Sequence, residues 1–432
     1  MLGFICYNSL KKIRGKRGCF MESISAKDRA ILRQTAAKQA ELAHTPKNLQ
    51  HIEEWKAHND FRGQRPMIHL ELWTFQQELI EPLLRCEGEA AREIERSLIC
   101  SFANQELLDD DKITPNYVPV GWHTHFIPFG LEENVTRIDG GLGHHFDPVI
   151  EDLEEDWGKL NPSRWGVDRP ATLAHKARLE ELLGDILPVK LTMNCLYSVP
   201  TQKLVHLMGM ETLLVSLYDY PELFLQLMER YADDTIAHYR WLEQEGLLLP
   251  TAGDESLGQG TLCYTTELPA SAEAAGRSLT TKDVWGFMDS QETVGVSPAM
   301  FEEFIFPAYH RIAEQYGLLS YGCCEPVHSI WDSCISKLDH LRKVSISPWC
   351  DEDFMGERLQ GRRCIYQRKP SPNLLGVDKV LDEEAVQAHI RKTMQAARGC
   401  TVELTQRDVY TIHNNPAKAR RYVELLREES TR

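Results

Sequence analysis

Two adjacent cysteines, Cys323 and Cys324, end a predicted strand in the segment LSYGCCEPVH, and Glu325 follows them directly. A thiolate is a nucleophile and a soft metal ligand, and bound Zn²⁺ keeps a thiol deprotonated at neutral pH. Neighbouring residues of an extended strand point in opposite directions. Both sulfurs therefore reach one ion or one substrate only if the backbone turns, which Gly322 permits. The segment predicts thiolate chemistry, with packed and inert thiols as the alternative.

A catalytic zinc site needs several protein ligands and one open position for the substrate. The expected metal ligands, all near predicted strand ends, are Cys323, Cys324, Glu325 and Cys350, with Asp351 and Glu403 as further candidates. His123 and His125 form a second candidate pair, because residues two apart on a strand share a face. Histidines on an ordinary surface are the alternative for that pair.

Other predicted strands also end in residues that can act on a substrate. Catalytic roles are expected for Cys323, Asp289, Tyr321 and Arg368, and substrate-binding roles for His69, Glu71, Lys369 and Gln406. A carboxyl such as Asp289 suits acid–base work, although it could instead cap the helix that follows. Arg368 and Lys369 suit an anionic group of a substrate, and ion pairs with nearby acids are the alternative.

The elements that carry these residues alternate between strand and helix. Residues 188–195, 283–290 and 318–324 are predicted strands, and residues 202–218 and 221–244 are predicted helices. This alternation predicts a parallel sheet with right-handed crossovers. The carboxyl ends of the strands of a parallel barrel meet at one mouth, where chemistry is usual. Because no glycine-rich dinucleotide loop is evident, we favour a barrel over a doubly wound sheet.

The fold class predicted for the 432 residues is α/β, a (β/α)8 TIM-type barrel with additions. We expect residues 1–20 to be a disordered tail or a mis-assigned start, because Met21 opens a capped helix. Residues 21–64 are expected to form an N-terminal helical extension. Residues 65–432 are expected to form the barrel, in which the irregular, aromatic stretch 101–170 is an insertion or a lid.

Composition narrows the class of partner. The formal net charge of -16 argues against nucleic acid or an anionic membrane surface, and no apolar run is long enough to span a bilayer. The twelve cysteines are scattered rather than densely spaced, as is usual for reduced thiols. These features favour a cytoplasmic enzyme that acts on a small-molecule substrate.

Three stretches resemble the uroporphyrinogen decarboxylase superfamily. They begin VPTQKLVHLM (199–233), DVWGFMDSQE (283–314) and VSISPWCDED (344–375). The resemblance extends over residues 188–428 and implies a (β/α)8 barrel. It also implies one of two chemistries: cofactor-free decarboxylation of a tetrapyrrole, or zinc-dependent methyl transfer to a thiol, often from a corrinoid protein.

The details of this resemblance favour the methyltransferase branch. The segment IHLELWTFQQEL (68–79) holds no arginine, whereas the decarboxylases of the family carry an arginine-rich segment there to bind propionates. The methyltransferases carry a His-x-Cys strand end. The matching residues here are Tyr321, Gly322 and Cys323, so the cysteine is kept and the histidine is replaced. A further family cysteine is expected near the last strand, where Cys400 stands at the opposite end.

The function expected from the sequence is therefore a zinc methyltransferase. It would move a methyl group between a small donor, a corrinoid protein and a thiol or pterin acceptor. A decarboxylase or other lyase acting on a carboxylate-bearing substrate is the first alternative. A non-catalytic binder of a corrinoid or tetrapyrrole is the second.

Overall fold

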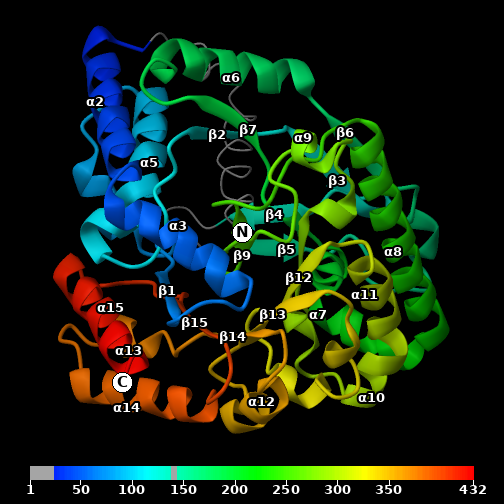
Figure 1. Ribbon diagram of the computed structural model, residues 1–432. Coiled ribbons are helices and arrows are strands. Elements are labelled where there is room, and N and C mark those ends of the chain that lie inside the picture. The colour runs from blue at the N-terminus through cyan, green and yellow to red at the C-terminus, as the bar shows by residue number, and fades with distance from the viewer. Residues whose placement is uncertain (1–23, 138–143) are drawn as a thin grey trace.

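A computed structural model describes residues 24–137 and 144–432 (Figure 1). The tail expected at residues 1–20 lies outside the described residues. None of the described helices has the length and apolar character needed to cross a membrane.

Seven parallel strands form the central sheet. In spatial order they are β1 (Met67–Leu70), β15 (Val402–Gln406), β14 (Ile365–Arg368), β13 (Leu341–Ile346), β12 (Leu318–Tyr321), β11 (Trp285–Met288) and β8 (Leu196–Tyr197). Every residue of β1, β11, β12, β14 and β15 is buried. Burial on both faces is typical of parallel strands that helices cover.

The sheet curves into a barrel in which β1 and β15, its first and last strands in chain order, pair directly. Met67 of β1 faces Glu403 of β15, and the pairing continues to Leu70 and Gln406. The predicted α/β barrel is confirmed. Its remaining side differs from a regular eight-stranded ring, because β2 (Val118–Gly121) and β7 (Val189–Thr192) form a separate parallel pair.

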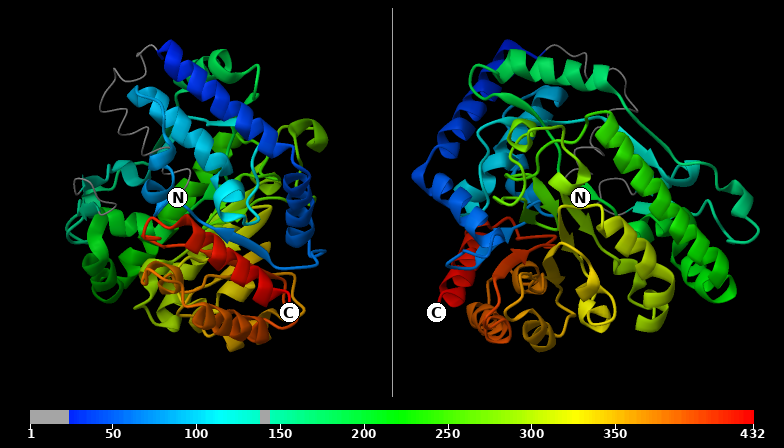
Figure 2. Two further views of the ribbon diagram at one scale, coloured as in Figure 1. Left: turned by 90° about the vertical axis from the view of Figure 1, so that its left-hand side faces the viewer. Right: turned by 45° about the vertical axis from the view of Figure 1, so that its right-hand side comes forward.

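Helices surround the sheet on its outer side (Figures 1 and 2). They include α7 (Pro200–Asp219), α8 (Pro221–Gln244), α11 (Phe306–Ala313), α12 (Glu352–Leu359), α14 (Glu383–Ala396) and α15 (Pro416–Ser430). The helix α8 starts with Pro221 in its first turn and buries one face, on which Phe224, Leu227 and Tyr231 recur at helical spacing. The predicted helices 202–218 and 221–244 are thus confirmed.

The N-terminal extension consists of two helices, α2 (Ala26–Ala43) and α3 (Pro46–Asn59). Thr45 caps α3, and Pro46 ends any continuous helix at this point. The side-chain amide of Asn59 donates to the carbonyls of Leu262 and Tyr264 at 3.1 and 2.6 Å. The extension is therefore tied to a hairpin in the middle of the chain.

That hairpin, β9 (Ser256–Gly258) and β10 (Thr261–Leu262), sends its tip among the inward side chains of the barrel. The tip residue Gln259 is buried and has a φ of 52°, between two glycines that also have positive φ. A Cβ on Gly260 would lie 2.6 Å from Thr405, so only glycine allows this approach. The sequence Gly-Gln-Gly thus lets the hairpin bring a polar side chain into the barrel.

The stretch 101–170 is partly an integral piece of the fold. It supplies β2, which pairs with β7. It also contains two antiparallel strand pairs: β3 (Thr124–Ile127) with β6 (Arg164–Val167), and β4 (Asn134–Arg137) with β5 (His144–Asp147). A role of this stretch as a lid stays a prediction.

Candidate functional site

The carboxyl ends of six strands bring polar side chains together inside the barrel. With the hairpin tip they form what we call the strand-end cluster: Glu71, Tyr197, Gln259, Asp289, Cys323, Cys324, Lys369 and Arg407. The neighbouring strand ends meet as the parallel arrangement predicts.

The two cysteines turn their sulfurs toward each other. The Sγ atoms of Cys323 and Cys324 lie 3.5 Å apart, although the residues are adjacent in the chain. Gly322 has a φ of 99°, and this left-handed residue ends the alternation of the strand. Cys323 is 5% exposed, whereas Cys324 is half-buried. The turn that pairing of the sulfurs requires is therefore present.

Two cations lie beside the sulfurs. Nη1 of Arg407 lies 3.6 Å from Sγ of Cys323. Nζ of Lys369 donates to the carbonyls of Gly322 and Cys323 at 3.4 and 3.1 Å. Lys369 is 3% exposed and has no carboxylate within 4.0 Å among the described residues. A buried ammonium group without a counter-ion favours an anion nearby, either a thiolate or a group of the substrate.

Arg407, in contrast, has a permanent partner. Its Nε lies 3.0 Å from a carboxylate oxygen of Glu71, and its Nη2 lies 3.8 Å from a carboxylate oxygen of Asp408. Although burial opposes charge on both partners, Arg407 holds the pKa of Glu71 below its usual value. Glu71 likewise keeps the pKa of Arg407 high. The pair is therefore ionised and positions the guanidinium next to Cys323.

The ionisation of the two thiols differs. The contact between the two sulfurs lowers the pKa of Cys324, because one thiol of the pair loses its proton more easily beside the other. The same contact, together with burial, raises the pKa of Cys323. The positive charges of Lys369 and Arg407 favour ionisation of either thiol. The pair is thus arranged to hold one proton and one negative charge.

Asp289 is a buried acid without a hydrogen-bond partner. It is 1% exposed, and neither of its carboxylate oxygens has a partner among the described residues. Burial raises the pKa of Asp289 well above its usual value, and the negative charges of Glu325 and Glu292 act in the same direction. A neutral carboxylic acid at this place can donate a proton or a hydrogen bond to a bound molecule.

The carboxylate of Glu325 binds backbone amides of the site. Its two carboxylate oxygens accept from the amides of Ser290 and Cys323, at 2.9 and 2.8 Å. The carboxylate thus fixes the loops after β11 and β12 in relation to each other. Both oxygens are engaged there, so Glu325 is poorly placed to bind a metal ion.

The predicted zinc ligands do not come together. Only Cys323 and Cys324 are close to each other. Cys350 lies in the loop after β13, where burial raises the pKa of its thiol. The two further candidates are also engaged, because Asp351 caps α12 and Glu403 pairs with Lys343 at 2.8 Å. Two sulfurs alone do not complete the four-ligand set of a protein zinc site.

One group of three candidate ligands is close together among the described residues, and it lies elsewhere. It consists of His310, Glu314 and Asp339, of which the two acids are exposed. His123 and His125 do not belong to it; His125 packs against Gly166 on the neighbouring strand β6. The donor set therefore does not fit the expected zinc site.

Three predicted site residues point away from the cluster into the helical layer. Arg368 pairs with Glu352 of α12 at 2.9 Å. The amide of Gln406 accepts from Tyr422 of α15. The hydroxyl groups of Tyr321 and Ser290 form a hydrogen bond at 2.6 Å, and the ring of Tyr321 packs against α11.

The remaining predicted residues are in or next to the cluster. His69 binds the carbonyl of Gly260 in the hairpin tip at 2.5 Å. Glu71, Asp289 and Lys369 belong to the cluster itself. In each strand end the inward residue alternates with an outward one, as the pleat requires.

Three cluster residues were missed. Arg407 follows the outward Gln406, and its position two residues after Thr405 would have placed it on the inner face. Tyr197 stacks on Phe287 at 4.9 Å, and burial and the charge of Asp289 raise its pKa. Gln259 comes from a hairpin distant in sequence, for which only the Gly-Gln-Gly pattern gave a signal.

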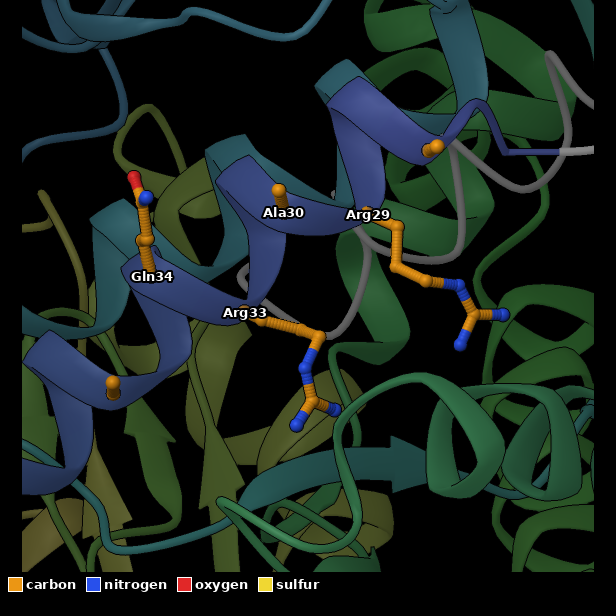
Figure 3. A pocket seen from close by; sticks show the side chains of 6 residues that line it. Arg29, Ala30, Arg33 and Gln34 are labelled. Carbon is orange, nitrogen blue, oxygen red and sulfur yellow. The ribbon is translucent and has the colours of Figure 1, made fainter.

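Surface hollows lie away from this site. One of about 500 Å³ is lined by α2 residues Ala26, Arg29, Ala30, Arg33, Gln34 and Ala37 (Figure 3). Its arginines are paired with Glu181 and Asp185. Another of about 580 Å³ lies where β12 and β13 begin. Neither includes a cluster residue, so the side-chain chemistry identifies the candidate site.

Two solved structures are similar to this chain. A methyltransferase from Methanosarcina mazei aligns over 88% of this chain and 98% of that one, with 12% identity and a TM-score of 0.49. A B12-independent methionine synthase from Shewanella sp. W3-18-1, in complex with selenomethionine, aligns over 76% and 86%, with 12% identity and a TM-score of 0.28. No protein-family model and no curated protein matches the sequence. The fold assignment therefore rests on the strand order, and the resemblance to the uroporphyrinogen decarboxylase superfamily stays a prediction.

Proposed function

We propose that this protein is a barrel enzyme that transfers a methyl or other small alkyl group, with a thiolate of the Cys323–Cys324 pair as the nucleophile. The observation that carries the proposal is the pairing of two sulfurs at 3.5 Å beside the cations Lys369 and Arg407. Thiolate character is what makes a cysteine nucleophilic, and nearby positive charge promotes it.

Asp289 supplies the proton that the reaction requires. The thiolate attacks the alkyl carbon of the donor, and the bond from that carbon to the donor atom breaks: to nitrogen in 5-methyltetrahydrofolate, to sulfur in a methylated thiol and to cobalt in methylcobalamin. The electron pair stays on the donor atom; a nitrogen or sulfur takes the proton of Asp289, and cobalt takes none. A carboxylic acid that keeps its proton suits this role, and burial raises the pKa of Asp289 in that direction.

In the second step, which releases the alkyl group, the enzyme sulfur is the leaving group instead of the nucleophile. An acceptor thiolate attacks the alkyl carbon, and the enzyme sulfur leaves with its electron pair as a thiolate. Lys369 and Arg407 stabilise that leaving thiolate by the same charges that promote the first step. The residues do not fit the expected zinc site, so no step is assigned to a metal ion.

The test follows the alkyl group on the protein. Purified protein is incubated separately with methylcobalamin, 5-methyltetrahydrofolate and a methylated thiol, and digested for peptide mass spectrometry. We expect one donor to add a methyl group to the peptide that contains Cys323 and Cys324. The double variant Cys323→Ala/Cys324→Ala should stay unmodified, and Cys350→Ala, a buried cysteine outside the cluster, should behave as wild type. Methylation that persists in the double variant, or no methylation from any donor, overturns the proposal.

Decarboxylation is a second candidate, because Asp289 is an unpartnered buried acid in a cluster that contains the unpaired cation Lys369. Lys369 would bind a substrate carboxylate, and Asp289 would protonate the carbanion left after carbon dioxide departs. Carbon dioxide release from uroporphyrinogen measures this activity. It should survive in the double cysteine variant and be lost in Asp289→Asn; no release by the wild type counts against it.

A further inference from the structure

The side chain of Gln259 connects the hairpin tip to both the cation and the inner sulfur. Its Oε1 lies 2.9 Å from Sγ of Cys323 and 3.3 Å from Nζ of Lys369. These contacts join three segments that are distant in the chain. They place a single acceptor atom between a thiol and an ammonium group.

The chemistry of Lys369 determines which end of the Gln259 amide faces the sulfur. An ammonium group has three donors and no acceptor, so the atom of Gln259 that faces it must be the oxygen. That same oxygen faces Cys323. Since a carboxamide oxygen cannot donate, the hydrogen bond at 2.9 Å requires the proton to be on the sulfur of Cys323.

The outer sulfur has different surroundings. Sγ of Cys324 lies 3.5 Å from that of Cys323. The acceptor for the proton of Cys324 is the carboxylate of Asp408 at 3.9 Å, a longer and weaker contact than the 2.9 Å between Cys323 and Gln259. Cys324 is half-buried, whereas Cys323 is enclosed by Gln259, Arg407 and its neighbour. The outer sulfur is thus the one that can both lose its proton and meet a substrate.

We infer that Cys324 is the sulfur that attacks, and that Gln259 is the positioning residue that keeps the proton on Cys323. The attack by Cys324 rests on the proposed alkyl transfer, but the order in which the two thiols ionise does not. Two charges favour the opposite order, because Arg407 lies near Cys323 and the carboxylate of Asp408 lies near Cys324. Arg407 shares its charge with Glu71 at 3.0 Å, and Asp408 lies 3.8 Å from Arg407, which leaves the Gln259 oxygen to decide.

The test measures how each thiol ionises rather than how well it is reached. Protein is treated with iodoacetamide over a range of pH, and the labelling rate of each cysteine is read from peptide mass spectra. The midpoint of the pH profile reports ionisation, and accessibility cancels from it. We expect the midpoint of Cys324 to lie below that of Cys323. It should also lie below that of the half-buried Cys400, whose pKa burial raises to about 11.

The variant Gln259→Leu removes the acceptor and keeps a side chain of similar length. One hydrogen bond contributes about 1 kcal/mol, so the ratio of the Cys324 and Cys323 ionisation constants should fall about fivefold. Gln259→Glu keeps an acceptor and should preserve the order. A midpoint for Cys323 below that of Cys324 in the wild type, or an unchanged ratio in Gln259→Leu, overturns the inference.

A second variant keeps the test decisive if Gln259→Leu fails to fold. Lys369→Met removes the group that fixes the Gln259 amide and leaves the hairpin sequence intact. The amide is then free to turn its NH₂ group toward Cys323, so the two midpoints should move closer together. Unchanged separation in Lys369→Met contradicts the role of Gln259. Failure of methyl transfer with the expected order of midpoints would overturn the proposed function and leave the ionisation order standing.

Discussion

Glu71 and Arg407, which are 336 positions apart in the chain, form a buried ion pair with an oxygen–nitrogen distance of 3.0 Å. They follow the paired strands β1 and β15, so the contact lies where the barrel closes. Trp73 donates to the same oxygen of Glu71 at 3.0 Å. The pair therefore has two functions: it joins the ends of the first and last strands, and it aims Arg407 at the cysteines.

Replacing Glu71 by glutamine should strongly destabilise the protein. The variant leaves the guanidinium of Arg407 buried without its main counter-charge, and breaking a buried pair in this way costs about 3 to 5 kcal/mol. The free energy of unfolding from urea titration checks this. Glu87→Gln breaks the exposed pair with Lys27 and should have a much smaller effect. Equal losses in the two variants would show that the Glu71 pair is not a structural contact.

Replacing Asp289 by asparagine should remove activity without lowering stability. The proton donor is lost, and a general acid contributes about 100- to 10,000-fold to a rate. Neither carboxylate oxygen has a partner that the folded state would lose. Turnover and urea titration of the same samples separate the two effects, with the exposed Asp233→Asn as the control. Full activity in Asp289→Asn would exclude Asp289 as the proton source.

Hydrophobic strands alternating with amphipathic helices were sufficient to predict the barrel and the meeting of the strand ends. The local pattern did not fix which residue at each strand end points inward. Lys369 and Arg407 point inward, whereas their neighbours Arg368 and Gln406 bind helices α12 and α15. A shift of one residue changes the face, so strand ends located to within one or two residues leave this undecided.

The metal site stays a prediction, and its expected ligands lie apart for a different reason. Cysteine, glutamate and a further cysteine at strand ends have suitable chemistry, but other groups compete for them. Glu325 accepts from two backbone amides, and Cys350 packs in a loop. Gln259 could not be placed because the hairpin reaches Cys323 across 64 residues. Such long-range partners depend on the packed barrel and not on local sequence.

Stability should decrease as the pH rises from about 4.5 to 7, in part because of Glu255. Burial and the charge of Asp254 raise the pKa of Glu255 to about 7 from an ordinary value of 4.5. In this window the folded state keeps a proton that the unfolded state has lost, so raising the pH favours unfolding. Below the window both states are protonated, and above it the penalty is constant.

The variant Glu255→Gln cannot ionise and should lose this contribution. The free energy of unfolding of this variant, minus that of wild type, should be larger at about pH 8 than at about pH 4. Urea titrations at both pH values measure the difference. Glu222→Gln, at an exposed surface site, controls for the change in net charge. A difference between Glu255→Gln and wild type that does not change with pH would contradict the raised pKa.

Gly322 should be indispensable to the cysteine pair. With a φ of 99°, it has a conformation that costs other residues about 1 to 3 kcal/mol. A Cβ there would also lie 3.1 Å from the Cβ of Ser345, so the strand or the loop must move. Gly322→Ala should therefore destabilise the protein and separate the two sulfurs. Urea titration measures the first effect, and the pH midpoints of Cys323 and Cys324 labelling measure the second.

Gly361→Ala provides the matched comparison for this prediction. Gly361 also has a positive φ, 73°, but its Cβ would have no neighbour within 4 Å. That variant should lose stability through backbone strain alone and keep the separation of the two cysteine midpoints. If Gly322→Ala loses no more stability than Gly361→Ala and keeps the midpoints apart, the turn at Gly322 is not what pairs the sulfurs. If the midpoints converge only in Gly322→Ala, the left-handed turn holds one thiol protonated beside the other.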